Sequence, residues 1–97
     1  MSKIFGYLGL CRRANKLSYG ETAMNDILTN HCCLCLIASD ASSNTKKKFI
    51  DKCNSHNVPY AIVVDSKELS YAIGKCNIKC FSINDANFAK MIKEALK

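Results

Sequence analysis

Three consecutive lysines, Lys46 to Lys48, are the side chains most clearly placed to bind another molecule. They follow a polar stretch at residues 41–45 that predicts the first turn of a helix, with Ser42 or Ser43 as its N-cap. The helix dipole is already positive there, so each such lysine is unfavourable by about 0.3–1 kcal/mol. Free N–H groups and ammonium groups could converge on one phosphate, although lysines that merely solvate an exposed helix face would give the same pattern.

A second candidate is the turn Tyr19-Gly20-Glu21, which precedes another predicted helix. Glycine lets a nucleic-acid backbone or base approach closely, and the carboxylate of Glu21 can accept hydrogen bonds from base N–H groups. On a basic surface such a carboxylate would supply selectivity rather than affinity. A structural role is also open, in which Gly20 forms the turn and Glu21 stabilises the start of the helix.

The cysteines are numerous for the length of the chain, but their number is odd, and three of them crowd one predicted strand, where Cys33 and Cys35 point to one side and Cys32 to the other. This argues against a disulfide framework, a zinc knuckle and a thiol oxidoreductase. We expect no metal and no cofactor, with reduced thiols filling core space in a cytoplasmic protein. The seven are Cys11, Cys32, Cys33, Cys35, Cys53, Cys76 and Cys80.

The elements that must position these residues alternate between helix and strand. The apolar run at residues 33–38 predicts a central strand that is buried on both faces. The alternation predicts an α/β fold, a three-layer α/β/α sandwich with a small mixed central sheet. Helices are expected over residues 2–14, 20–30, 43–56, 65–73 and 85–96, and extended segments over residues 16–18, 33–38, 60–64 and 79–83.

Apolar stripes predict which face of each helix packs on the sheet, and these stripes are more typical of a core than of a cofactor site. The last helix is expected to begin at Asn84 as its N-cap. The residues expected to face the core are Ile4, Phe5, Leu8 and Cys11 in the first helix, Phe49, Ile50 and Cys53 in the third, and Phe88, Met91, Ile92 and Ala95 in the last.

Composition narrows the class of protein. The 97 residues contain 14 Lys and Arg against 8 Asp and Glu, a formal net charge of +6, which favours a nucleic-acid partner. The length predicts one domain over residues 1–97, and the longest apolar run, at residues 32–38, is too short to span a bilayer. The short apolar run gives no reason to expect membrane association, and we expect no export. Because no pair of carboxylates and no His–nucleophile pair converges, we also expect no enzyme.

Several segments together resemble the kink-turn RNA-binding ribosomal proteins, the family of the archaeal L-seven-Ae and the eukaryotic L-thirty-e proteins. These segments are LSYGE at residues 17–21, LCLIASDA at residues 34–41, and NVPY at residues 57–60 followed by EL-x-x-AIG at residues 68–74. The last combination is the most specific, and the likeness covers nearly the whole chain.

The resemblance implies a protein of the L-thirty-e fold that grips a sharply bent RNA stem-loop containing tandem sheared G·A pairs. In the family, an Asn-Glu pair before the second helix faces the guanines, and a lysine follows one turn later. This chain keeps Glu21 but has Gly20 in place of the asparagine and Met24 in place of the lysine. The family's remaining RNA-binding loops correspond here to residues 40–45 and 75–78.

We therefore expect a monomeric protein that binds kink-turn RNA in ribosomal RNA, structured mRNA or a non-coding RNA, with the ribosome as one candidate partner. Lys46, Lys47 and Lys75 would neutralise phosphates, and Ile78 would pack against an extruded base. A protein-interaction module of the same fold with weak RNA affinity and, less favoured, a thiol-dependent enzyme stay open as alternatives. The candidate RNA-binding residues are Gly20, Glu21, Asp40, Ser42, Asn44, Thr45, Lys46, Lys47, Lys75 and Ile78.

Overall fold

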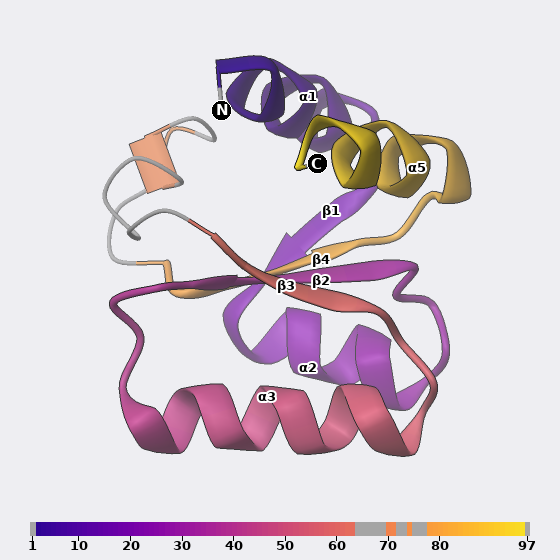
Figure 1. The fold of residues 1–97 in the computed structure, drawn as a ribbon. Helices are drawn as coiled ribbons and strands as arrows, with labels where there is room; N and C mark the ends of the chain where they lie inside the picture. The colour runs from indigo at the N-terminus through magenta and orange to yellow at the C-terminus, as the bar shows by residue number, and fades with distance from the viewer. Residues whose placement is uncertain (1, 64–69, 72–73, 75–77, 97) are drawn as a thin grey trace.

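The computed structural model describes residues 2–63, 70, 71, 74 and 78–96. Helices and strands alternate along most of this part of the chain, as the periodicity of the sequence predicts. Element labels follow Figure 1. In chain order the elements are α1 (Ser2–Arg13), β1 (Leu17–Tyr19), α2 (Gly20–Leu28), β2 (Leu34–Ala38), α3 (Ser43–Ser55), β3 (Tyr60–Val63), β4 (Cys80–Ile83) and α5 (Ala86–Ala95).

The strands form a four-stranded mixed sheet with the order β1-β4-β2-β3. Strands β2 and β3 are parallel, whereas β4 lies antiparallel to both β1 and β2. Helices α1 and α5 cover one face of the sheet, and α2 and α3 cover the other (Figure 1). The predicted three-layer α/β/α sandwich with a small mixed sheet is therefore confirmed.

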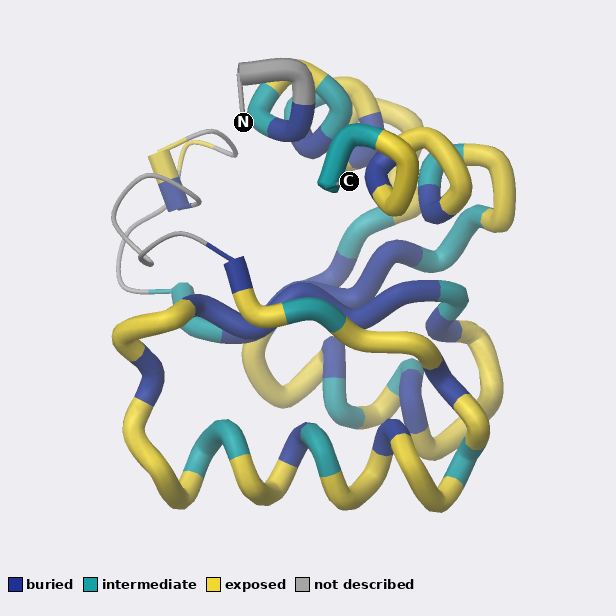
Figure 2. The backbone as a smooth tube through the Cα atoms, viewed as in Figure 1, coloured by how far each residue is buried: buried dark blue, intermediate teal, exposed yellow. Residues whose placement is uncertain are grey.

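Strand β2 organises the core because all five of its side chains are buried. Leu34, Leu36 and Ala38 pack in the cluster beneath α1 and α5. Cys35 and Ile37 point the other way, into the cluster beneath α2 and α3. Figure 2 shows β2 and β4 as a buried layer between helices whose outer faces are exposed, whereas β3 at the edge of the sheet is mostly exposed or half-buried.

Two sequence predictions about the last helix were wrong. Asp85, rather than Asn84, is the N-cap of α5, and its carboxylate accepts hydrogen bonds from the N–H groups of Asn87 and Phe88. The amide of Asn84 is instead hydrogen-bonded to Asp26. Met91 was predicted to lie in the buried stripe but is 37% exposed. The buried residues of α5 are Ala89 and Ile92.

Part of the predicted helix before Gly74 lies outside the described residues, as does Val64 of the predicted strand. Gly74 itself has a φ of 75° and its N–H donates to the carbonyl of Tyr71, which is consistent with the predicted helix stop. Within the described part of the chain, no helix is both long and apolar enough to cross a membrane.

The N-cap of α5 gives a stability prediction. Asp85→Ala removes the acceptor for two N–H groups of the first turn and is expected to lower the free energy of unfolding by about 1 kcal/mol. Urea denaturation followed by circular dichroism measures this difference. Lys90→Ala, on the exposed face of the same helix, is the control and should change stability by less than about 0.5 kcal/mol. Equal effects of the two variants would contradict the capping role.

Candidate nucleic-acid interface

A hollow of about 390 Å³ opens on the side of the sheet that carries α2 and α3. Each of three segments supplies part of its wall: the start of α2, the first two turns of α3, and the chain that enters β4. The lining residues are Gly20, Glu21, Met24, Thr45, Lys48, Phe49, Ile78, Lys79 and Cys80. Four of these, Gly20, Glu21, Thr45 and Ile78, were predicted from the sequence.

The hollow has an apolar floor and a charged rim. Phe49 and Cys80 are buried, and Met24 is half-buried against the same cluster. Glu21 and Lys48 are exposed. An aromatic and thioether surface of this kind suits a flat ring, and the charged groups around it can fix the orientation of a bound polar molecule.

The backbone of Gly20 sets the direction of the first turn of α2. Its φ is 62°, a left-handed value that side chains rarely adopt, while a Cβ placed there would meet no atom within 4 Å. The need for glycine is therefore conformational and not a matter of space. The turn leaves Glu21 in the first turn of α2, where a carboxylate is favoured by the helix dipole.

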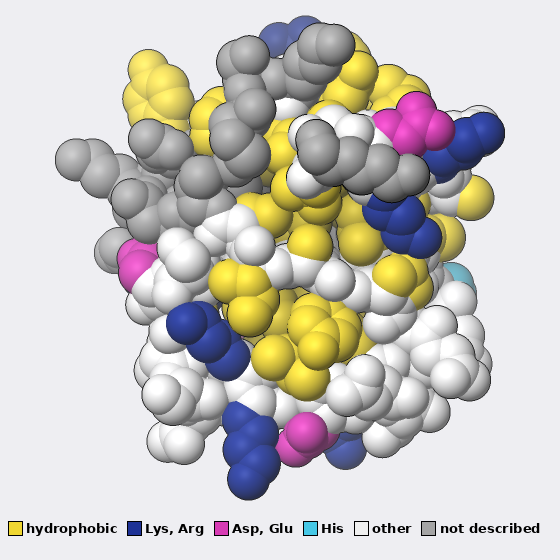
Figure 3. Space-filling view, in the orientation of Figure 1, with side chains coloured by type: hydrophobic (Ala, Val, Ile, Leu, Met, Phe, Trp, Pro, Cys, Tyr) yellow, Lys and Arg dark blue, Asp and Glu magenta, His cyan; other side chains and the backbone are white. Residues whose placement is uncertain are grey.

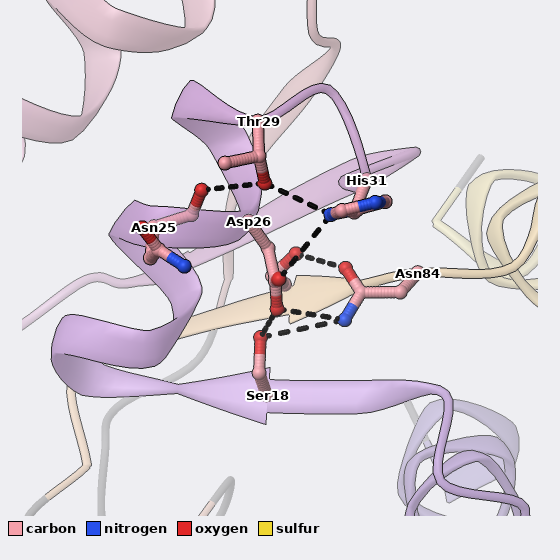
Figure 4. Close-up of polar contacts among 7 residues, drawn as sticks. Ser18, Asn25, Asp26, Thr29, His31 and Asn84 are labelled. Atoms are coloured by element: carbon pink, nitrogen blue, oxygen red, sulfur yellow. Dashed lines mark hydrogen bonds and ion pairs between the residues drawn. The ribbon is translucent and has the colours of Figure 1, made fainter.

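A polar network behind the hollow ties α2 to the sheet (Figure 4). The carboxylate of Asp26 accepts hydrogen bonds from the hydroxyl of Ser18 on β1, at 2.5 Å, and from the amide of Asn84, at 2.9 Å. The hydroxyl of Ser82 on β4 donates to the side-chain oxygen Oδ1 of Asn84. The network therefore holds α2 against β1 and against the end of β4.

The sequence analysis assigned no role to this network, since the contacts that Asp26 makes with Ser18 and Asn84 join residues 8 and 58 positions apart along the chain. Ser70 was also missed. Its buried hydroxyl accepts a hydrogen bond from the N–H of Ile78 at 2.8 Å and donates to the carbonyl of the same residue at 3.2 Å. Ser70 therefore holds the backbone of Ile78 at the edge of the hollow.

The start of α3 agrees with the prediction, but the place of the lysines in the helix does not. Ser42 is the N-cap, and its hydroxyl accepts a hydrogen bond from the N–H of Thr45. The helix begins at Ser43, and the N–H of Lys46 already donates to the carbonyl of Ser42. The lysines consequently lie in the second turn, so the prediction that they crowd the first turn beside free N–H groups was wrong.

The lysines of α3 also point in different directions. Successive residues of a helix are 100° apart, so Lys46 and Lys48 lie on nearly opposite sides of α3. Lys48, which belongs to the predicted lysine run but was not among the candidate RNA-binding residues, lines the hollow together with Glu21. Lys46, Lys47 and Asn44 are not among the lining residues.

Asp40 and Lys79 form an ion pair at the rim, with Nζ of Lys79 3.0 Å from Oδ2 of Asp40. Both side chains are partly exposed. The backbone of Lys79 is held as well, because its carbonyl accepts a hydrogen bond from the N–H of Ala38 at the end of β2. Asp40 thus acts on the hollow through Lys79. Lys75 lies outside the described residues.

The cysteines in the described part of the chain are free thiols. Burial raises the pKa of Cys32 to about 11 and the pKa of both Cys11 and Cys80 to about 12. A hydrogen bond between Cys35 and Cys53 raises the pKa of the Cys35 thiol and lowers that of the Cys53 thiol. Among the residues the structure describes, no group of three or more His, Cys, Asp or Glu side chains could hold a metal ion.

This fold and its lined hollow define a small α/β/α protein of the class suggested by the sequence motifs. The chain belongs to the Ribosomal protein L7Ae/L30e/S12e/Gadd45 family, which it matches over residues 2–93. It is 39% identical to "RNA-binding protein YlxQ" of Bacillus subtilis (strain 168) over 89 residues, which cover 91% of this chain and 89% of that protein.

Two further proteins are similar over nearly their whole length. "RNA-binding protein YlxQ" of Enterococcus faecium is 38% identical over 96 residues, which cover 98% of this chain and 92% of that protein. A solved structure described as "The structure of a protein with unknown function from Bacillus halodurans C" superposes with a TM-score of 0.92. It is 33% identical, and the match covers 97% of this chain and 96% of that chain.

The backbone of Gly20 gives a second stability prediction. Gly20→Ala is expected to lower the free energy of unfolding by about 1 kcal/mol, because an L side chain is strained at a φ of 62°. Gly20→Asn should cost less, since asparagine tolerates this conformation best. Gly6→Ala, in the exposed middle of α1, is the matched control and should instead stabilise by about 0.5–1 kcal/mol. Urea denaturation of the three variants measures these differences, and a loss of stability in Gly6→Ala equal to that in Gly20→Ala would contradict the conformational argument.

Proposed function

We propose that the protein is a non-enzymatic RNA-binding protein whose ligand is a kink-turn, with the bent internal loop of the RNA seated in the hollow between α2, α3 and the start of β4. The observation that carries the proposal is the convergence of the Glu21 carboxylate, an apolar floor and Lys48 in one hollow. Family membership and the names of the two YlxQ relatives support RNA as the ligand.

Each part of the hollow suits one feature of such an RNA. The carboxylate of Glu21 would accept hydrogen bonds from guanine N–H groups, which become accessible where the helix is bent and its pairs are sheared. Phe49 and Ile78 would pack against a base that has left the stack. Lys48 and Lys79 would contact phosphates, and Asp40 would hold the ammonium group of Lys79 in place.

The departures from the family pattern change the balance between these contributions. Gly20 provides the turn without an amide side chain, and Met24 replaces a cation with an apolar surface on the floor of the hollow. We therefore propose that recognition relies more on RNA shape and base packing, and less on phosphate contacts from α2. Ribosomal RNA or a structured mRNA in the cytoplasm is the proposed ligand.

The first functional prediction concerns Glu21. Glu21→Ala should weaken binding to a kink-turn RNA by about ten-fold or more, the loss of one good base-edge contact, while binding to an unbent duplex of the same length changes little. Fluorescence anisotropy with the two RNAs measures both affinities. Glu94→Ala, an exposed glutamate on α5 in the opposite layer, is the control and should affect neither.

Equal losses for the two RNAs would reject the readout role of Glu21. Equal and weak binding of both RNAs by the unaltered chain would favour the alternative, a protein-interaction module of the same fold with little affinity for RNA.

The second functional prediction concerns the lysines of α3. Lys48→Ala should reduce the slope of log affinity against log salt by about 1, because one phosphate contact is lost. Lys47→Ala, the adjacent lysine outside the hollow, should change the slope less. Titrations of the kink-turn RNA at several salt concentrations measure both slopes. If Lys47→Ala reduces the slope more than Lys48→Ala does, the phosphate contact lies outside the hollow, at Lys47, as the sequence analysis predicted.

A further inference from the structure

Strand β3 is the exposed edge of the sheet. Its neighbour on one side is β2, and no strand in the described part of the chain lies on its other side. Two of its four residues are large hydrophobic side chains that stay open to solvent, Tyr60 at 38% and Ile62 at 50%. Exposed edges usually carry charged residues or proline that prevent further pairing, whereas β3 carries no charge and has only Pro59 before it.

The backbone of β3 is also available at these two positions. The carbonyls of Pro59 and Val63 accept hydrogen bonds from β2, from the N–H groups of Cys35 and Ser39 at 2.9 and 2.8 Å. Backbone groups alternate in direction along a strand, so the N–H and C=O groups of Tyr60 and Ile62 point away from β2. The same two residues thus offer both the hydrogen-bonding groups and the apolar side chains that an added strand requires.

The side chains of β3 face different layers. Val63 is part of the core cluster beneath α1 and α5, and Ala61 packs against it. Tyr60 and Ile62 therefore lie on the other face of the strand, above α3. Figure 3 shows hydrophobic side chains gathered over β3 and between β3 and α3, with Lys or Arg side chains beside them. We call Tyr60, Ile62 and the outward backbone of β3 the β3 edge.

Charge decides between the kinds of strand that could occupy the β3 edge. Helix α3 carries four lysines against one aspartate, a formal charge of +3. A second copy paired antiparallel through β3 would continue the sheet and place two α3 helices side by side on the same face. Two such basic helices repel each other, as do two chains of net charge +6.

We propose that the β3 edge binds an extended segment of another protein, which adds as a fifth strand and is apolar at alternate positions with Asp or Glu flanking the apolar residues. Its main chain pairs with the N–H and C=O groups of Tyr60 and Ile62, which gives affinity. Its apolar side chains pack beside Tyr60 and Ile62, and its carboxylates lie near the lysines of α3, which gives selectivity.

In the experiment, displayed peptides of about ten residues are selected for binding to the full chain. Peptides that also bind the Ile62→Lys variant are then removed. The expected result is a set of peptides with alternating apolar residues and flanking acidic residues. One such peptide, made synthetically, should bind Ile62→Lys about ten-fold more weakly than the unaltered chain. Leu10→Lys is the matched control, because Leu10 is also 50% exposed but lies on α1, and it should retain the affinity.

Hydrogen exchange supplies the geometric readout. Bound peptide should slow exchange at the amides of Tyr60 and Ile62 by about ten-fold or more, since those groups become paired. Thermal unfolding checks that each variant is folded, and Tyr60→Lys tests the same edge if Ile62→Lys does not fold.

Several outcomes would overturn the proposal. These are the absence of any peptide whose binding depends on Ile62, enrichment of basic peptides, and binding that leaves both amides unprotected. Sedimentation that shows self-association of the unaltered chain, abolished by Ile62→Lys, would assign the edge to a second copy instead. A loss of kink-turn RNA affinity in Ile62→Lys but not in Leu10→Lys would assign it to RNA.

Discussion

The burial of β2 on both faces is the constraint on which the rest of the structure depends. Its five side chains are apolar, so neither face of the strand can be left to water. Leu36 packs in the buried cluster beneath α1 and α5, and Ile37 packs in the cluster beneath α2 and α3 on the other face. Because β2 lies between β4 and β3, the same strand aligns the ends of the segments that form the hollow.

The hollow arises where the layer of α2 and α3 meets the chain that enters β4. The floor belongs to the hydrophobic core, since Phe49 and Cys80 are members of the buried cluster on that side. The chain that enters β4 forms one wall, and its backbone is held by hydrogen bonds, that of Ile78 to Ser70 and that of Lys79 to Ala38. A binding surface built on fixed backbone of this kind loses little conformational entropy when a ligand binds.

Helix α3 lies between the two proposed binding surfaces, the hollow and the β3 edge. Lys48 lies on one side of this helix and lines the hollow. Lys46 lies on nearly the opposite side, and Ile50, four residues further along the helix, lies on the same side as Lys46. A single basic helix can therefore serve two surfaces, an RNA site at the hollow and the β3 edge. The two proposals rest on different residues and can be tested separately.

The sequence by itself determined the layers, the strands and the cap of α3, because periodicity, glycine turns and capping residues act over a few neighbouring positions. It identified the Gly20-Glu21 turn, Ile78 and the start of α3, but it placed the lysines of α3 in the first turn instead of the second and assigned the cap of α5 to Asn84 instead of Asp85. Only the tertiary structure decided that Lys48 and Glu21 line the same hollow, that Asp40 pairs with Lys79, and that Asn84 joins Asp26. These contacts join residues far apart in the chain, and their formation depends on the rotation of each helix against the sheet, which packing of the whole core sets.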